Sequence, residues 1–247
     1  MAACSAAALI EVWEPSSRAP PHRRLAKLLA ETEGQAAISG DTLGGRNRRL
    51  LMLHRTLVGS ALEARVTCAH CAAESEFALP AEGILAAPAP GPDVRVRVRS
   101  GRHTLSFRLP RMTDIEAAML AQADGDVRRV VLERCRVGGD AAITKAAAAR
   151  LAREFEALDP AANIIVNIAC SGCARPIAAS VDLASFIARD LDRLADSLFR
   201  DVDMIASVYG WNEQQILALP PERRRRYVAL IAAARTPARP SLAGGRA

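Results

Sequence analysis

Two pairs of cysteines with the same short spacing are the residues of this sequence best suited to chemistry. Cys68 and Cys71 form one Cys-x-x-Cys pair, and Cys170 and Cys173 form the other. Each pair brings two thiolates within reach of one ion, and zinc takes four such ligands in a tetrahedral arrangement. A site closed by four cysteines has no open coordination position. The pattern therefore predicts zinc as a structural cofactor and argues against a catalytic metal.

The separation of the two pairs is unusual for a zinc ribbon, in which they usually lie about 15–20 residues apart. Here residues 72–169 intervene, so we expect a large insertion carried on the ribbon. A thioredoxin-like redox pair is a second interpretation, but it would precede a helix, and neither pair does so convincingly. Two disulfides would require an oxidising compartment. His70 lies inside the first pair and is an alternative fourth ligand.

No other pattern in the sequence indicates a catalytic site. Segment 40–45 (GDTLGG) matches neither of the phosphate-binding glycine motifs, and no serine or cysteine has a recognisable histidine partner. The four histidines are scattered, and we interpret His54 as a packed or surface residue rather than a ligand. We therefore expect no enzymatic activity and no small-molecule substrate.

Short strands flank both cysteine pairs. After the first pair, every second residue is apolar or small, at Ala73, Ser75, Phe77 and Leu79. Before the second pair the same period of two occurs at Ile164, Val166 and Ile168, as is typical of a strand with one apolar face. A strand on either side of a Cys-x-x-Cys turn is the local structure of a zinc ribbon. We therefore place each pair in the turn of a small antiparallel hairpin.

The clearest hairpin is predicted inside the insertion, over residues 94–109. Its apolar face carries Val94, Val96, Val98, Leu105, Phe107 and Leu109, and its first strand turns three arginines to the other face, Arg95, Arg97 and Arg99. Clustered guanidinium groups suit phosphate binding. The alternative is the solvated outer face of a sheet that is covered on one side only, which is common in antiparallel sheets.

Helices are predicted before the first cysteine pair and within the insertion. The first covers residues 22–34, a loop follows at 39–45, and a second helix begins at Asn47 with four inward residues, Leu50, Leu53, Leu57 and Val58. In the insertion, Thr113 and Glu116 match a capping box at the start of two helices that break at Gly125. Cys135 is expected to be a small buried hydrophobe. A further helix, capped by Asp140, turns three residues inward, Leu151, Phe155 and Leu158.

A long amphipathic helix is predicted from Asp182, its N-cap, to Gly210, its stop. Its apolar stripe is Leu183, Ile187, Leu191, Leu194, Leu198, Val202 and Ile205, and its aspartates should meet water at positions 190, 192, 196, 201 and 203. Asn212 and Gln215 match a capping box for a short helix, and a last helix begins after Pro220. On that helix we expect Tyr227, Leu230, Ile231 and Ala234 to share a face ringed by Arg223, Arg224, Arg225 and Arg226.

Segment 209–231 has a distinctive order of residues: an aromatic-Gly-Trp, a short acidic helix, Leu-x-Leu-Pro, an arginine run, then tyrosine and aliphatics. This order resembles the C-terminal signature of the T-even-phage-type baseplate hub assembly proteins, whose relatives occur in tailed phages and phage-tail-like contractile injection systems. The resemblance extends more weakly through the cysteine pairs to the N-terminal helices. It implies a role, as chaperone or baseplate component, in building a contractile tail, with other baseplate or hub proteins as partners and no known reaction.

The composition sets limits on the remaining choices. The 247 residues carry a formal net charge of +6, which permits but does not require an acidic or nucleic-acid partner. Neither a signal peptide nor a transmembrane stretch is expected, so the expected location is the cytoplasm, away from membranes, with reduced cysteines. A nucleic-acid-binding zinc-ribbon protein remains the alternative function. Aromatic residues that could stack on bases are scarce near the arginines.

These observations predict an α+β protein with a small zinc-ribbon-like antiparallel sheet, a large insertion, flanking helices and a long C-terminal helix. Expected segments are an N-terminal helical part, a ribbon region with its insertion, a C-terminal helical part and a disordered tail, at 1–60, 61–181 (insertion about 82–160), 182–235 and 236–247. The expected partner-binding residues are Trp211, Arg223, Arg224, Arg225, Arg226 and Tyr227.

Overall fold

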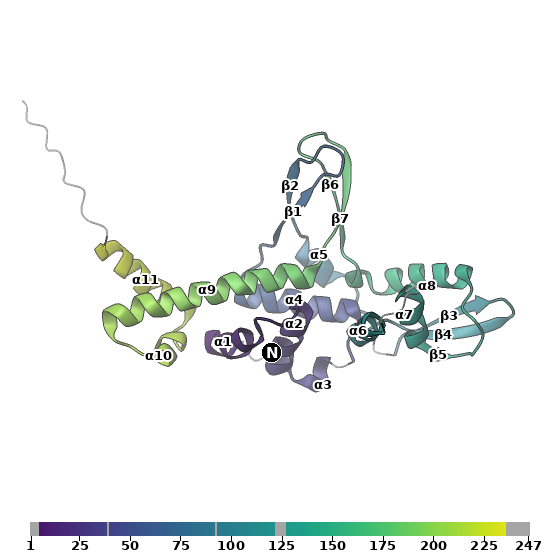
Figure 1. The fold of residues 1–247 in the computed structure, drawn as a ribbon, viewed down its shortest axis with the longest axis horizontal. Helices are drawn as coiled ribbons and strands as arrows, with labels where there is room; N and C mark the ends of the chain where they lie inside the picture. Colours follow the sequence, from purple (N-terminus) through teal and green to yellow (C-terminus); the bar gives the residue numbers. More distant parts are fainter. Residues whose placement is uncertain (1–4, 39, 92, 122–126, 236–247) are drawn as a thin grey trace, which may run out of the picture.

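The computed structural model describes residues 5–38, 40–91, 93–121 and 127–235. Figure 1 shows an elongated molecule in which one long helix, α9 (Leu183–Tyr209), runs along a helical body. A small sheet with its helices lies at one end, and α10 (Glu213–Leu217) and α11 (Pro221–Arg235) lie at the other. Two hairpins rise from the same side of the body. No helix within the described ranges is both long and apolar enough to cross a lipid bilayer.

The helical body packs around one apolar core. α1 (Ala6–Trp13), α2 (Pro21–Glu33) and α4 (Leu43–Leu57) turn apolar side chains toward one face of α9. That face is the stripe expected from the spacing of three and four, because its core positions are buried at Leu183, Ile187, Leu191 and Leu198. The short helices of this part are η1 (Glu14–Ser16), α3 (Gln35–Ile38) and α5 (Ala81–Ala86).

Helix α4 begins earlier than the sequence suggested. The Thr42 hydroxyl accepts a hydrogen bond of 3.0 Å from the Gly45 N–H, so the first turn forms inside the predicted loop at 39–45. The helix also ends earlier, and this leaves Val58 exposed instead of facing inward. The N-cap outweighs the low helix propensity of the two glycines that follow it.

Two separate two-stranded antiparallel sheets carry the cysteine pairs. β1 (Glu63–Thr67) pairs with β2 (Glu74–Ala78), and β6 (Ile165–Ala169) pairs with β7 (Pro176–Ser180). The predicted α+β class, with zinc-ribbon-like hairpins and long C-terminal helices, is confirmed. The expected single small sheet is instead split, because each hairpin pairs only with itself among the described strands.

Much of the segment between the two hairpins forms a second lobe around its own core, whereas α5 packs on the helical body. β3 (Arg95–Ser100) and β4 (His103–Arg108) are the predicted hairpin, and β5 (Arg136–Gly138) adds a third strand beside β4. Inward side chains of the sheet are buried against α8 (Lys145–Leu158), namely Val96, Val98, Leu105 and Phe107. The three arginines of β3 are exposed on the other face. The lobe also contains α6 (Met112–Leu120), α7 (Val127–Cys135) and η2 (Pro160–Ala162).

Helix α6 does not use the predicted capping box of Thr113 and Glu116. The helix starts two residues earlier, with Arg111 as its N-cap, and the Asp114 carboxylate accepts the Arg111 N–H at 2.9 Å. Asp114 is fully buried and also receives both terminal nitrogens of Arg108, at 2.6 and 2.8 Å. This carboxylate therefore fixes the end of β4 to the start of α6. The predicted break at position 125 lies outside the described residues.

Helix α8 is capped by Thr144 and not by Asp140. The Thr144 hydroxyl accepts the Ala147 N–H at 3.2 Å, whereas Asp140 precedes the helix by several residues and lies too early to cap it. Leu151 is buried as expected, but Leu158 is exposed. Leu158 is the last residue of the helix, beyond the part that covers the sheet.

The C-terminal helices begin and end where the sequence predicted. Asp182 caps α9, and Gly210 ends it with a left-handed φ of 68°. Asn212 and Gln215 form the expected capping box, with hydrogen bonds of 2.9 and 3.0 Å between their side chains and each other's N–H groups. The predicted disordered tail at 236–247 lies outside the described residues.

Three of the α9 aspartates that were expected to meet water contact side chains of other helices, and of these three Asp192 remains 48% exposed. Each contacts a basic side chain from a different helix that packs against α9. The pairs, with N–O distances of 3.0, 2.6 and 3.1 Å, are His54–Asp190, Arg24–Asp192 and Arg224–Asp201. The His54, Arg24 and Arg224 side chains are all buried, so these contacts fix α4, α2 and α11 against the long helix.

Candidate metal centre

The two Cys-x-x-Cys turns have the same backbone geometry. In the first turn the Cys68 N–H donates to the Ala73 carbonyl at 2.9 Å, and the Ala72 N–H donates to the Cys68 carbonyl at 2.9 Å. The second turn repeats both bonds between residues 170 and 175, at 2.8 and 2.9 Å. Ala72 and Ala174 occupy equivalent positions, each with a left-handed φ of 58°. Each hairpin therefore ends in a knuckle that points two thiols in one direction.

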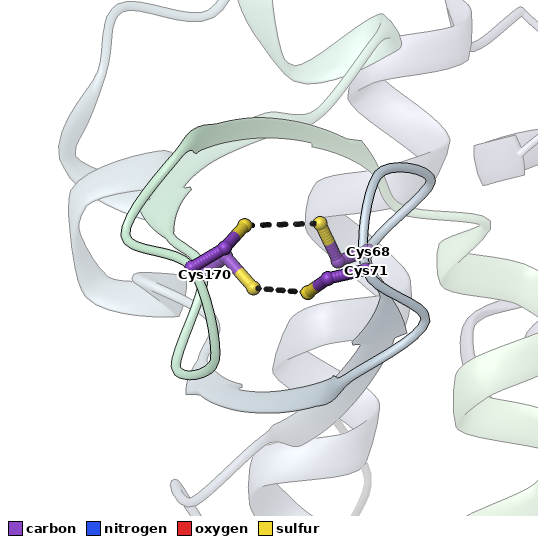
Figure 2. Close-up of side chains that lie close together, drawn as sticks. Cys68, Cys71 and Cys170 are labelled. Carbon is purple, nitrogen blue, oxygen red and sulfur yellow. Dashed lines mark hydrogen bonds between the residues drawn. The ribbon is translucent and has the colours of Figure 1, made fainter.

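The knuckles place their four sulfur atoms in one cluster. Figure 2 shows the two hairpin tips facing each other, with the side chains of Cys68, Cys71 and Cys170 pointing into the space between them. The Sγ atoms of Cys71 and Cys170 are 3.6 Å apart, and those of Cys68 and Cys173 are 3.9 Å apart. All four sulfurs lie within 4.8 Å of one another. Tetrahedral zinc–thiolate bonds of about 2.3 Å require sulfur separations of about 3.8 Å, so the cluster has the size of a metal site.

Backbone N–H groups favour the thiolate form at one of these ligands. The N–H groups of Cys173 and Gly172 hydrogen-bond Cys170 Sγ and lower the pKa of that thiol to about 6. At Cys173 the Arg175 N–H acts in the same direction, but burial and the neighbouring thiols outweigh it and raise the pKa to about 12. Without a metal, therefore, Cys170 and Cys173 do not ionise together. A cation among them would favour the deprotonated form of all four.

Contacts between the two tips hold the knuckles together. The Ser171 N–H donates to the Ser75 hydroxyl at 3.0 Å, and the Ser171 hydroxyl donates to the Glu74 carbonyl at 3.0 Å. Gly172 packs so closely that a Cβ there would lie 2.8 Å from the Cβ of Ala73. Only glycine fits at this position without displacing the opposite knuckle.

The hairpins separate below their tips. An open cavity of about 790 Å³ lies between them and the N-terminal half of α9, and residues of β1, β2 and β7 line it. Along the four strands only Ser75 and Ala179 are buried, and the inward apolar side chains are half-exposed. The hairpins therefore have little apolar core of their own.

The remaining predicted ligands and cysteines lie outside the cluster. His70, the alternative ligand, is exposed, and its Nδ1 lies 3.4 Å from an Arg175 nitrogen instead of pointing at the sulfurs. Cys135 is fully buried, as expected, and burial followed by the nearby Asp114 charge raises the pKa of its thiol to about 12. Cys4 lies outside the described residues. Across the part of the chain that the structure describes, the four knuckle cysteines are the group that fits a metal ion.

His54 proves to be a buried structural residue. Its side chain is fully buried, with Nδ1 3.1 Å from the Gly59 carbonyl and Nε2 3.0 Å from Asp190. Both partners are hydrogen-bond acceptors, so the ring joins the end of α4 to α9. The contact between His54 and Asp190 joins residues far apart in the sequence, so no local sequence pattern could have indicated it.

The predicted partner-binding residues divide into two groups. Trp211 and Tyr227 are half-buried and lie together at the corner between α9 and α11, where Arg223, Arg225 and Arg226 are exposed. Arg224 is buried in its pair with Asp201, so it holds α11 in place and does not belong to an outward surface. The expected shared face of α11 is also only partly formed. Ile231 is buried, but Leu230 and Ala234 are exposed.

Comparison of the chain with family models, with curated proteins and with solved structures finds no match. The function of the chain is therefore inferred from the geometry of the four-cysteine cluster and from the residue order of the C-terminal segment.

Proposed function

We propose that the four cysteines bind one structural zinc ion. The observation that carries this proposal is the closed set of four sulfurs at the spacing of a tetrahedral site. Four thiolate ligands leave no position for a substrate or an activated water, so the proposal assigns no reaction to the chain. The metal would connect two hairpins that otherwise share few buried contacts.

We further propose that the chain is a non-enzymatic assembly protein, as chaperone or resident component, of the baseplate of a contractile phage tail or related injection system. Support comes from the order of residues in segment 209–231, which resembles the signature of the baseplate hub assembly family. The arrangement in Figure 1 suits such a role, because the C-terminal corner projects from the body and offers exposed arginine and aromatic side chains. Its partners would be other baseplate or hub proteins.

The experiment that tests the assembly role is a deletion in a host that produces contractile particles. Deletion should leave few complete sheath–tube particles in electron micrographs, and expression of the wild-type chain should restore them. A Trp211→Ala variant should restore fewer, whereas a variant at an exposed site on the opposite lobe, Val137→Ala, should restore them fully. Normal particles in the deletion strain would refute the assembly role.

Nucleic-acid binding is the second candidate function, and the exposed arginines of β3 favour it. They lie at the opposite end of the molecule from the arginines of α11, so the two groups do not form one continuous basic track. If Arg95, Arg97 and Arg99 are only a solvated face, their replacement by Gln should leave DNA retention unchanged. A binding constant for random duplex DNA that falls steeply with salt, and falls further in that variant, would favour the second candidate.

A further inference from the structure

Three aromatic rings form a cluster at the corner between α9 and α11. Tyr209 and Trp211 stack with ring centroids 5.4 Å apart, and Tyr227 contacts both rings edge-on at 5.4 and 5.1 Å. Tyr209 is 40% exposed, so the cluster is open to solvent on one side. Below it Ile205, Ile216 and Ile231 form a small buried core that holds the rings in place. The rings therefore form a preorganised surface.

Arginines without acidic partners border this cluster. Along α11 the charges of Arg224 and Arg225 are balanced by Asp201 and Glu222. Arg223 and Arg226 are exposed, and no acidic side chain of the described residues forms an ion pair with either. At spacings of three and four, these two arginines share one face of α11 with Tyr227 and with the exposed Leu230, which is 48% accessible.

We propose that this surface, defined by Tyr209, Trp211, Arg223, Arg226, Tyr227 and Leu230, binds an acidic amphipathic segment of a partner protein. The proposal rests on the assembly function and specifies the chemistry of its partner. Aliphatic side chains of the segment would cover Tyr209 and Leu230, and its carboxylates would neutralise the two arginines. Tyr, Trp and Arg are the residues enriched at the centres of protein interfaces.

The charge and the ring contacts of this surface favour an acidic segment of a partner protein over two other occupants, the chain's own tail and single-stranded nucleic acid. The tail at 236–247 contains two arginines and no acidic residue, so it cannot neutralise the surface from within the chain. Single-stranded nucleic acid binds by stacking bases on free aromatic faces. Here the rings of Tyr209 and Trp211 stack on each other, and the ring of Tyr227 makes a T-shaped contact with both. The three rings therefore already contact one another. A protein segment with apolar and acidic side chains fits better than either.

The two tryptophans of the chain allow a direct test by NMR of the full-length metal-loaded protein. Trp13 is buried and donates its indole N–H to Asp192 at 2.8 Å, on the body of the molecule, so its signal serves as an internal reference. The probe is a synthetic helical 15-residue peptide with leucines on one face and glutamates on the other. Titration should shift the Trp211 indole signal and leave that of Trp13 in place.

Matched peptides and variants identify the cause of the shift. The same peptide with Lys for Glu should bind at least tenfold more weakly, and so should the peptide with Ala for Leu. Arg223→Gln with Arg226→Gln should weaken binding of the glutamate peptide about tenfold, whereas Arg95→Gln with Arg97→Gln on the opposite lobe should not. Both pairs of arginines are exposed, so neither double variant should impair folding.

The proposal is overturned if the Trp211 signal does not respond to the glutamate peptide, if it responds equally to the lysine peptide, or if it responds only to a single-stranded DNA oligonucleotide added in a separate titration. Failure of peptide binding in a chain that still restores contractile particles would remove the acidic-segment assignment and leave the assembly role standing. Normal particles in the deletion strain would remove the assembly role itself, whatever the peptide result.

Discussion

The knuckle hairpins and the sheet of the inserted lobe are built from similar strands but stabilised differently. In both, side chains alternate between an inner and an outer face. In β3 and β4 the inner residues Val96, Val98, Leu105 and Phe107 are buried under α8. In the knuckle hairpins most of the equivalent positions stay half-exposed; Ser75 and Ala179 are the buried strand residues, and Cys68 and Cys170 are buried at the tips. Strand periodicity alone therefore does not reveal what holds a hairpin together.

This difference has an energetic consequence. A hairpin of two strands is only marginally stable in water, whereas three strands covered by a helix can be stable without help. Because ligands in an unfolded hairpin are not preassembled, the free energy of the proposed metal binding would become free energy of folding for the hairpins. We therefore expect the two regions to respond to different perturbations, and the following experiments separate them.

The largest effect is expected for Cys170→Ser. Loss of one thiolate opens the four-sulfur site, so bound zinc should fall from about one ion per chain to nearly none. Hydrogen exchange of the amides in β1, β2, β6 and β7 should accelerate, while β3 and β4 stay protected. Cys135→Ser is the matched control, because it alters a buried cysteine outside the cluster and should keep the zinc. Full zinc occupancy in the Cys170 variant would contradict the proposed ligand set.

The converse variant is Phe107→Ala, in the core of the inserted lobe. Removal of a fully buried phenylalanine ring should destabilise the lobe by about 3–5 kcal/mol, measured by hydrogen exchange of β3 and β4. Zinc content should be unchanged. Val137→Ala, at an exposed site on the neighbouring strand, should cost less than about 0.5 kcal/mol. Loss of zinc on mutation of Phe107 would mean that the two regions depend on each other.

Asp114 gives the inserted lobe a pH dependence. Burial alone would raise the pKa of this carboxyl, but hydrogen bonds from Arg108 and the Arg111 N–H outweigh burial and hold the pKa below its usual value. A lowered folded-state pKa means that the stabilisation is complete above the unfolded value of about 3.9 and is lost as the pH falls below it.

Asp114→Asn should therefore destabilise the lobe at pH 7 by about 1.5–3 kcal/mol, since charged hydrogen bonds to a buried group are lost. The difference between variant and wild type should shrink as the pH falls below about 4, in a denaturant titration followed by the exchange of β4 amides. A difference that stays constant down to pH 2 would show that the charge of Asp114 does not stabilise the lobe.

The smallest effect is expected at the two knuckle alanines. Ala72 and Ala174 have left-handed φ values, a conformation that costs an L-residue about 1–2 kcal/mol and costs glycine little. Ala72→Gly and Ala174→Gly should each stabilise the hairpins by about 0.5–1 kcal/mol and tighten zinc binding in a competition assay. Ala178→Gly, in the extended strand β7, should have the opposite sign. Destabilisation by both knuckle glycines would show that the left-handed turns carry no strain.

Local sequence patterns were sufficient to predict the features that depend on interactions between residues close together in the chain. The Cys-x-x-Cys spacing, the alternation in β3 and β4, and the caps at Asp182, Gly210 and Asn212 all act within a few residues. The assembly of the two knuckles into one cluster could also be anticipated, because four thiols of matched context satisfy one tetrahedral ion.

Contacts between distant segments could not be predicted from the sequence. The aspartates of α9 look like a solvated face until α2, α4 and α11 bring Arg24, His54 and Arg224 against them. Arg224 is hardest to distinguish, because it sits in a run of four arginines and only the packing of α11 buries one of them. The caps at Thr42 and Thr144 were missed for a different reason, since several residues at each helix start can act as N-caps.

The central claim is that one metal ion holds together two hairpins that are not stable without it. The most direct measurement is hydrogen exchange of the full-length protein, purified with its metal, before and after chelation under reducing conditions. We predict about one zinc per chain, and loss of protection after chelation in β1, β2, β6 and β7, while β3, β4 and α9 keep theirs. Hairpin amides that remain equally protected in metal-free protein would contradict the claim.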